Sequence, residues 1–147
     1  MSRFALVVFH PRRDDALHAA LETCQALAAQ NMLVVLTKEL HGELETFAGK
    51  LNRKVALSGI RFLGVDCNLE DLEVVVVLGG DGTILKAAEM VRSSQTPIIG
   101  INLGHVGFLA ESEREELAEA VHRVVDGDYL VTELLTVDVS VQVEGKE

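Results

Sequence analysis

The stretch that decides the fold is Val74 to Thr83, which reads VVVVLGGDGT. Four valines and a leucine in a row predict a buried β-strand, because branched side chains favour extended backbone and a strand covered on both faces needs no polar alternation. After the glycine-rich turn, apolar residues share one face of a helix at Ile84, Leu85, Ala88 and Val91. The stretch therefore predicts a strand, a glycine loop and a helix, with the strand at the centre of a sheet.

The residues on either side of this stretch repeat the alternation of strands and helices. Apolar runs predict strands over Phe4 to Phe9, Met32 to Leu36, Ile60 to Val65 and Pro97 to Ile101. Other patterns predict an amphipathic helix from Asp14 to Gln30 with Asn31 at its end, a short helix within His41 to Asn52, and, from a capping box of Ser112 and Glu115, a helix that stops at Gly127. This alternation indicates an α/β fold with an open, doubly wound, Rossmann-like and mostly parallel sheet.

The last segment departs from that pattern. From Tyr129 to Val143 the apolar residues fall mostly on odd positions, while Asp138, Ser140 and Gln142 fall on even ones. Strict alternation predicts an antiparallel strand with one buried face. We therefore expect two parts, an α/β nucleotide-binding domain over residues 1–128 and, over residues 129–147, the start of a truncated C-terminal β-rich domain.

The composition limits the classes of protein to consider. The chain has 147 residues, 48% of them apolar, and a mean hydropathy of +0.25, which is enough for one domain with a buried core. A formal net charge of −10 disfavours nucleic acid as a partner, so a nucleotide would need a local phosphate cradle and a divalent cation. The two cysteines, Cys24 and Cys67, lie far apart, and no apolar run suits a signal sequence or a membrane span. We expect a cytoplasmic protein with no membrane partner.

Three predicted strand ends carry sequence that could bind a ligand. They are His10-Pro11-Arg12-Arg13, Gly79-Gly80-Asp81-Gly82-Thr83, and Gly100 to Phe108 (GINLGHVGF). In an open α/β sheet, ligands bind in the crevice beyond the carboxyl ends of the strands. The three ends are therefore candidates for one shared site.

The loop from Gly79 to Thr83 joins a strand to a helix, so its backbone amides and the helix N-terminus converge where a phosphate could lie. It matches neither the Walker loop nor the G-x-G-x-x-G fingerprint. Asp81 could bind a phosphate through a metal ion or accept a proton from an attacking hydroxyl. Lys86 lies one turn into the helix, from where it could reach a phosphate. The alternative is structural, with Asp81 or Thr83 capping the helix and the glycines forming a tight turn.

The second glycine cluster, Gly100 to Phe108, is longer than a strand-to-helix turn requires, which indicates a loop shaped around a ligand. Asn102 can donate and accept hydrogen bonds, and Phe108 offers a flat wall for a base or a ribose. The alternative is an Asx-turn at Asn102, with Phe108 in the core. His10 and His105 have no carboxylate at ligand spacing, so we predict no metal site made by the protein alone.

Taken together, the two glycine motifs resemble those of a known family. Gly79-Gly80-Asp81-Gly82-Thr83, followed after the next strand by Gly100 to Glu111 (GINLGHVGFLAE), looks like the N-terminal domain of bacterial NAD kinases, and the likeness covers essentially the whole chain. The first motif is shared with diacylglycerol and sphingosine kinases and, more loosely, with phosphofructokinases. The second separates them, because lipid kinases would show a Pro-x-Gly-Thr-Gly-Asn-type loop where this chain has Gly-Ile-Asn-Leu-Gly.

The resemblance implies an activity and a set of residues. It implies transfer of the terminal phosphoryl group of ATP, or of polyphosphate, to the 2′-hydroxyl of the adenosine ribose of NAD, with Mg²⁺ or another divalent cation. Asp81 would be the catalytic residue that deprotonates the hydroxyl, Gly82 would allow close approach of the dinucleotide, and Phe108 would line the NAD pocket. The nucleotide-binding residues implied in full are Gly79, Gly80, Gly82, Thr83, Asn102, Gly104, Gly107 and Phe108. We also expect a homo-oligomer.

Two alternatives and one departure accompany this interpretation. The first motif alone would suit a diacylglycerol-type lipid kinase domain, and the valine-rich edge of the last predicted strand would suit a non-catalytic nucleotide-binding or oligomerisation module. Family members usually carry a Glu-Arg pair where this chain has Glu133 and Leu134. Because the family's Asn-Asp or Asn-Glu motif and most of its NAD contacts lie in a C-terminal domain, we expect the chain alone to have little or no activity.

Overall fold

The computed structural model describes residues 2–52, 57–103, 112–113, 117–134, 139–140 and 142. Six strands form one sheet in the order β3-β2-β1-β4-β5-β6, and every neighbouring pair is parallel. The strands are β1 (Phe4–Phe9), β2 (Leu33–Leu36), β3 (Arg61–Phe62), β4 (Leu72–Gly79), β5 (Ile98–Asn102) and β6 (Ser112–Glu113). This order confirms the doubly wound, Rossmann-like sheet predicted from the sequence.

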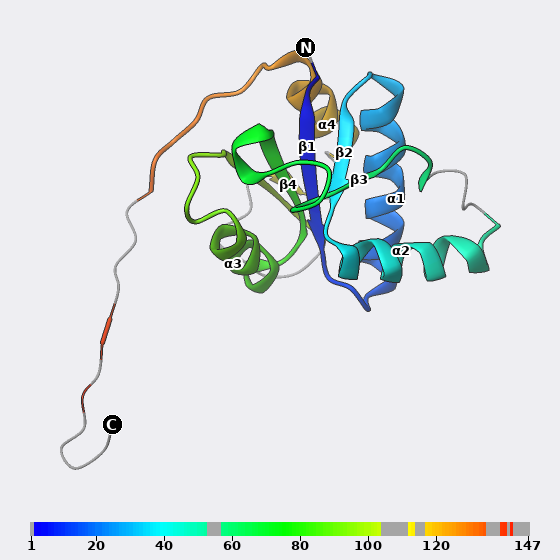
Figure 1. The fold of residues 1–147 in the computed structure, drawn as a ribbon, viewed down its shortest axis with the longest axis horizontal. Helices are drawn as coiled ribbons and strands as arrows, with labels where there is room; N and C mark the ends of the chain where they lie inside the picture. The colour runs from blue at the N-terminus through cyan, green and yellow to red at the C-terminus, as the bar shows by residue number, and fades with distance from the viewer. Residues whose placement is uncertain are drawn as a thin grey trace.

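Helices cover both faces of the sheet. They are α1 (Asp14–Ala29), α2 (Lys38–Lys50), α3 (Asp81–Met90) and α4 (Leu117–Asp126), and a short 3₁₀ turn at Leu69–Asp71 precedes β4. The chain moves from β1 to β2 in one direction and from β4 to β5 in the other, so right-handed crossovers place α1 and α3 on opposite faces. Figure 1 shows these two helices on either side of β1 and β4, with α4 beside α1.

The core is centred on β1 and β4, and β1 pairs with β4 along its whole length. Ala5 to Phe9 are all buried, as are Val74 to Leu78, because helices cover both faces of these strands. The valine run is thus at the centre of the sheet, as its composition predicted. The predicted ends of two helices are also correct, since Asn31 and Gly127 both have positive φ and close six-to-one hydrogen bonds, from Met32 N to Leu27 O and from Asp128 N to Arg123 O.

Three elements differ from the sequence prediction. Helix α2 begins earlier, at Lys38, because the Thr37 side chain accepts a hydrogen bond from the Leu40 amide and caps it. Strand β3 is shorter than predicted because the chain turns after Phe62, whose amide donates to the Asp66 carboxylate. The capping box at Ser112 is wrong, because Ser112 pairs with Ile101 and extends the sheet as β6.

The strand predicted over Tyr129 to Val143 is not formed by the part of that range that the structure describes, residues 129–134, 139–140 and 142. These residues leave the α/β unit after α4 (Figure 1), and Leu130 is 97% exposed. A strand needs a hydrogen-bonded neighbour, and these residues pair with none of the six strands. The division into residues 1–128 and 129–147 stays a prediction. No helix among the described residues is both long enough and apolar enough to cross a membrane.

At the amino end of the sheet, Arg3 joins three parts of the chain. Its guanidinium donates to both carboxylate oxygens of Glu73, at 3.1 and 2.8 Å, and to the Val125 carbonyl at 2.7 Å. The side chain thus links β1, β4 and the C-terminal end of α4, where a positive charge also meets the negative end of the helix dipole. Tyr129 lies nearby, and burial together with the Glu73 carboxylate raises the pKa of its hydroxyl.

We expect Arg3→Gln to lower the free energy of unfolding by about 1 kcal/mol, because it removes a two-pronged ion pair that is partly exposed to solvent. Arg92→Gln is the control, since Arg92 contacts Glu89 at 3.8 Å on a well-exposed surface and should change stability far less. Urea denaturation measures both variants. Equal effects would show that the Arg3 contacts contribute nothing specific.

Candidate functional site

The sheet order creates a crevice at one place. From β1 the chain continues toward β2, and from β4 it continues toward β5, so the loops that follow these two adjacent strands diverge. Ligands of open α/β sheets bind at such a switch point, beyond the carboxyl ends of the strands. The segments concerned are residues 10–13 after β1 and, after β4, Gly80 with the first turn of α3, residues 81–83.

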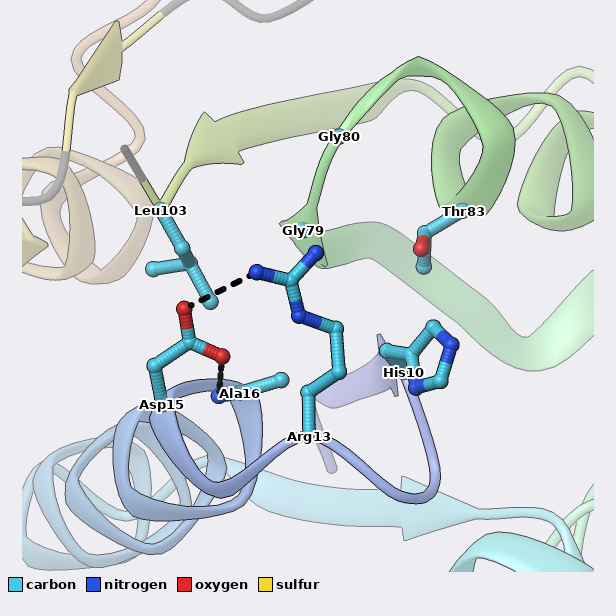
Figure 2. Close-up of a pocket in the computed structure, with 8 residues that line it drawn as sticks. All are labelled: His10, Arg13, Asp15, Ala16, Gly79, Gly80, Thr83 and Leu103. Atoms are coloured by element: carbon cyan, nitrogen blue, oxygen red, sulfur yellow. Dashed lines mark hydrogen bonds and ion pairs between the residues drawn. The ribbon is translucent and has the colours of Figure 1, made fainter. Parts of the chain in front are cut away.

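A shallow hollow lies at this switch point and opens to solvent, with a volume of about 200 Å³ when the solvent at its mouth is included. Figure 2 shows the side chains and loops around it. Its lining comes from all three strand ends singled out in the sequence, and consists of His10, Arg13, Asp15, Ala16, Gly79, Gly80, Thr83 and Leu103. The fold thus brings together residues that are far apart in the sequence, since His10 and Leu103 are about 90 positions apart.

The glycine loop leads directly into α3. Gly80 is the N-cap residue with extended backbone, and its carbonyl accepts the first helical bond, from the Ile84 amide at 3.1 Å. Asp81 is therefore the first residue inside the helix, and the alternative in which Asp81 or Thr83 is the N-cap is wrong. With no side chain at the N-cap, the positive end of the α3 dipole faces the switch point.

Gly79 and Gly82 differ in the reason that glycine is needed at each position. A Cβ on Gly79 would lie 2.7 Å from Thr83 Oγ1 and 3.0 Å from Thr83 Cβ, so Gly79 is needed for the packing of the loop against its own helix. A Cβ on Gly82 would meet nothing within 4 Å. Packing, together with a φ of +157° that residues with a side chain rarely adopt, therefore explains Gly79, whereas a ligand that approaches the helix N-terminus would explain Gly82.

On the β1 side, three polar side chains follow the strand. The Arg13 side chain crosses the hollow toward Gly79 (Figure 2), and its terminal nitrogen lies 3.5 Å from Asp15 Oδ2. The other Asp15 oxygen accepts the Ala16 amide at 2.7 Å. His10 accepts the Arg12 amide on Nδ1 at 3.2 Å, so the neutral ring carries its proton on Nε2.

Three basic side chains act on His10 at this site, although the chain is acidic overall, and the carboxylate of Asp15 lies among them. Desolvation lowers the pKa of His10, and the positive charges of Arg12, Arg13 and Lys86 lower it further, while Asp15 opposes them. These basic groups and the N-termini of α1 and α3 gather at one edge of the sheet. The switch point therefore has the local cradle that an anionic ligand requires.

The lowered pKa of His10 predicts a pH dependence. Because the folded protein binds the proton less readily than the unfolded chain does, the contribution of His10 to stability is complete above the unfolded pKa of about 6.5. That contribution is lost as the pH falls through the folded pKa. We expect the free energy of unfolding to decrease less between pH 7 and pH 5 in His10→Gln than in the unaltered chain, as measured by urea denaturation. If the free energy of unfolding changed equally with pH in His10→Gln and in the unaltered chain, His10 would not be the source of the pH dependence.

The residues predicted from the sequence fall into three groups. Gly79, Gly80 and Thr83 line the hollow, while Asp81 and Gly82 follow at the start of α3, half-buried and exposed respectively. Asn102 is buried at the end of β5, opposite Gly79 in the sheet. Gly104, Gly107 and Phe108 belong to residues 104–108, the later part of the second glycine motif, which lies outside the described residues. Leu134, which stands where the family usually has arginine, is 77% exposed.

Sequence reasoning missed Asp15 and gave Arg13 no separate role. Their positions could have indicated a role, because Arg13 and Asp15 lie at the junction between the first strand and the helix that follows it. The sheet order places this junction at the switch point. Among the described residues no cluster of three or more histidine, cysteine, aspartate or glutamate side chains could hold a metal ion.

Comparison with known proteins assigns the family. Residues 5–129 match the family model described as the ATP-NAD kinase N-terminal domain. The NAD kinase of Leifsonia xyli subsp. xyli is 45% identical over 141 residues, which are 96% of this chain and 44% of that protein. The NAD kinase of Thermobifida fusca is 38% identical over 99% of this chain and 43% of that protein. The chain thus spans less than half the length of these relatives.

A solved structure has the same fold. The crystal structure of yeast NADH kinase complexed with NADH superposes with a TM-score of 0.68 over 85% of this chain and 38% of that one, at 21% sequence identity. The likeness supports the sheet order and the crossovers described above. Because the family match covers residues 5–129 and both relatives align along nearly the whole sequence, the chain belongs to the ATP-NAD kinase family, as an N-terminal domain.

Proposed function

We propose that this chain forms the phosphate-donor wall of a NAD kinase active site. The reaction would transfer the terminal phosphoryl group of ATP, or of polyphosphate, to the 2′-hydroxyl of the adenosine ribose of NAD. One observation carries the proposal: in a chain of this family, the hollow at the β1–β4 switch point is lined by Gly79, Gly80 and Thr83, which stand on either side of Asp81 in the sequence. Positive charge and helix dipoles converge there, as phosphates require.

The residues would act mainly by position and charge, as is general for phosphoryl transfer. The glycine loop and the N-terminus of α3 would bind donor phosphates through backbone amides. Asp81 would orient the ribose hydroxyl and accept its proton as the new bond forms between O2′ and phosphorus. The bond from that phosphorus to its bridging oxygen breaks, and ADP and NADP leave. Gly82, which has open space around it, would let the dinucleotide approach the helix.

A divalent cation such as Mg²⁺ fits this arrangement as a companion of the donor. Mg²⁺ is usually held by one or two carboxylates together with substrate phosphates, and Asp81 lies beside the loop that would hold those phosphates. When bound, the cation would neutralise charge on the transferred group. Asn102, Gly104, Gly107 and Phe108 would belong to the NAD side of the site. We also propose a cytoplasmic homo-oligomer, as expected from the resemblance and from two cysteines that are both free.

The proposed function is tested with a chimera, in which this chain is joined to the part of the Leifsonia xyli NAD kinase that it does not match. The chimera is incubated with ATP, Mg²⁺ and NAD, and NADP is measured with an NADP-specific dehydrogenase. We expect the chimera to form NADP and the chain alone to form little or none. The intact Leifsonia enzyme is the positive control.

Two results would favour the alternatives. Phosphorylation of diacylglycerol but not of NAD by the folded chimera would favour a lipid kinase domain. A dimeric chain with no measurable affinity for NAD or ATP by calorimetry, in a chimera without kinase activity, would favour a non-catalytic module. Either result would overturn the proposed function.

A further inference from the structure

The size of the hollow limits what it can hold. The hollow at the switch point is shallow and opens to solvent, and the space it encloses is far smaller than a whole nucleotide, so it suits one end of the ligand, such as a phosphate. Its glycine loop and basic surroundings match the phosphate end.

Arg13 is the basic side chain best placed for such a phosphate. It lines the hollow, is 42% exposed, and reaches from the β1–α1 connection toward the glycine loop at Gly79 (Figure 2). Guanidinium groups match phosphate geometry because their N–H groups form a planar fork. The neighbouring Arg12 is also exposed but does not line the hollow, although its charge still reaches His10.

Two contacts of Asp15 differ in length. Its Oδ1 accepts the Ala16 amide at 2.7 Å, which fixes the carboxylate at the first turn of α1. Its Oδ2 lies 3.5 Å from Arg13, longer than the roughly 2.7–2.9 Å of a strong charge-assisted hydrogen bond. Figure 2 shows one terminal nitrogen of Arg13 turned to Asp15 and the other turned toward the glycine loop. The Ala16 amide thus fixes the carboxylate, and the carboxylate contacts one terminal nitrogen of the Arg13 guanidinium.

We propose that Arg13 contacts the terminal phosphates of the donor and that Asp15 is a positioning residue that turns the Arg13 guanidinium toward the glycine loop. This assignment rests on the proposed function for the identity of the donor. The anion subsite itself rests on the hollow, its charge and the geometry of Arg13.

The test compares two arginines that carry the same charge at adjacent positions. Inorganic pyrophosphate is titrated into the chain by calorimetry at low salt, with circular dichroism to establish that each variant is folded. We expect Arg13→Gln to weaken binding by about tenfold or more and Arg12→Gln by less than about threefold. Equal losses for the two variants, or no binding by the unaltered chain, would overturn the assignment of Arg13.

Asp15→Asn decides whether Asp15 orients Arg13. Asparagine can still accept the Ala16 amide, so α1 keeps its first-turn contact, but the ion pair is lost. If Asp15 orients Arg13, pyrophosphate binding weakens by about twofold to fivefold. If Asp15 acts only through its negative charge, binding becomes tighter, and if it is only structural, binding stays the same while thermal stability falls. Either of the last two results would overturn the positioning role.

The same variants in the chimera separate this proposal from the proposed function. We expect Arg13→Gln to raise the KM for ATP and to leave the KM for NAD nearly unchanged. If the chimera forms NADP and Arg13→Gln does not change the KM for ATP, Arg13 loses its role while the proposed function stands. If the chimera forms no NADP but the chain binds pyrophosphate through Arg13, the anion subsite stands and the proposed function fails.

Discussion

Replacing Asp81 with asparagine lowers the kcat for NADP formation by the chimera about 100-fold to 10,000-fold. This is the range that a positioned general base contributes, and asparagine keeps the shape of the side chain while it cannot take up the ribose proton. Asp81 is half-buried at the first position of α3, immediately after the two glycines of the hollow. Initial rates at saturating ATP and NAD measure the effect.

Asp14 provides a matched control for this substitution. It is the first residue of α1, as Asp81 is of α3, and Asp14→Asn makes the same change of charge at the same position in a helix. We expect Asp14→Asn to leave kcat within about twofold and to change stability by less than about 1 kcal/mol. A chimera in which Asp81→Asn is as active as Asp14→Asn would remove Asp81 from the mechanism.

The largest effect on stability is expected at Gly79. Gly79→Ala places a Cβ 2.7 Å from Thr83 Oγ1 and 3.0 Å from Thr83 Cβ, and Thr83 cannot move away easily because it belongs to the first turn of α3. We expect the free energy of unfolding to fall by about 1–3 kcal/mol, the usual range for overpacking a well-packed region. Urea denaturation of the chain measures the loss.

Gly82→Ala and a double variant test the cause. A Cβ on Gly82 meets nothing within 4 Å, so Gly82→Ala should keep or raise stability, by up to about 1 kcal/mol, since alanine favours the helix. It should nevertheless reduce NADP formation by the chimera if the dinucleotide approaches at that point. Adding Thr83→Ala to Gly79→Ala should recover part of the lost stability, because it removes the Oγ1 contact but not the Cβ contact. No recovery would show that the clash is not the cause.

Most of the fold could be predicted because its signals are local. The apolar runs of β1 and β4, the spacing in α1 and the helix ends at Asn31 and Gly127 are each set by neighbouring residues. The failures came from contacts across the sheet. Ser112 has the local pattern of a helix cap, but pairing with Ile101 draws it into β6. The alternation after Tyr129 is typical of a strand, yet a strand forms only beside a partner.

The sequence predicted which loops form the site, but it did not predict the roles of the individual side chains in them. The strand ends at His10 and Gly79 could be grouped because parallel strands end at the same edge of a sheet. The distinction between Gly79 and Gly82 could not be seen in the sequence, since it depends on where the Thr83 side chain lies. Arg13 and Asp15 gained a role only once the sheet order placed the β1–α1 connection opposite the glycine loop.

The central claim is that donor phosphates bind at the switch point between β1 and β4. The most direct test is a ¹⁵N–¹H correlation spectrum of the chain, recorded during titration with ATP and Mg²⁺. We expect the largest shifts at the backbone amides of Gly80 and Thr83 and of the β1–α1 connection around Arg13, on both walls of the hollow. Shifts confined to the opposite end of the sheet around Arg3 and Glu73, or no shifts in the glycine loop at saturating ATP, would contradict the claim.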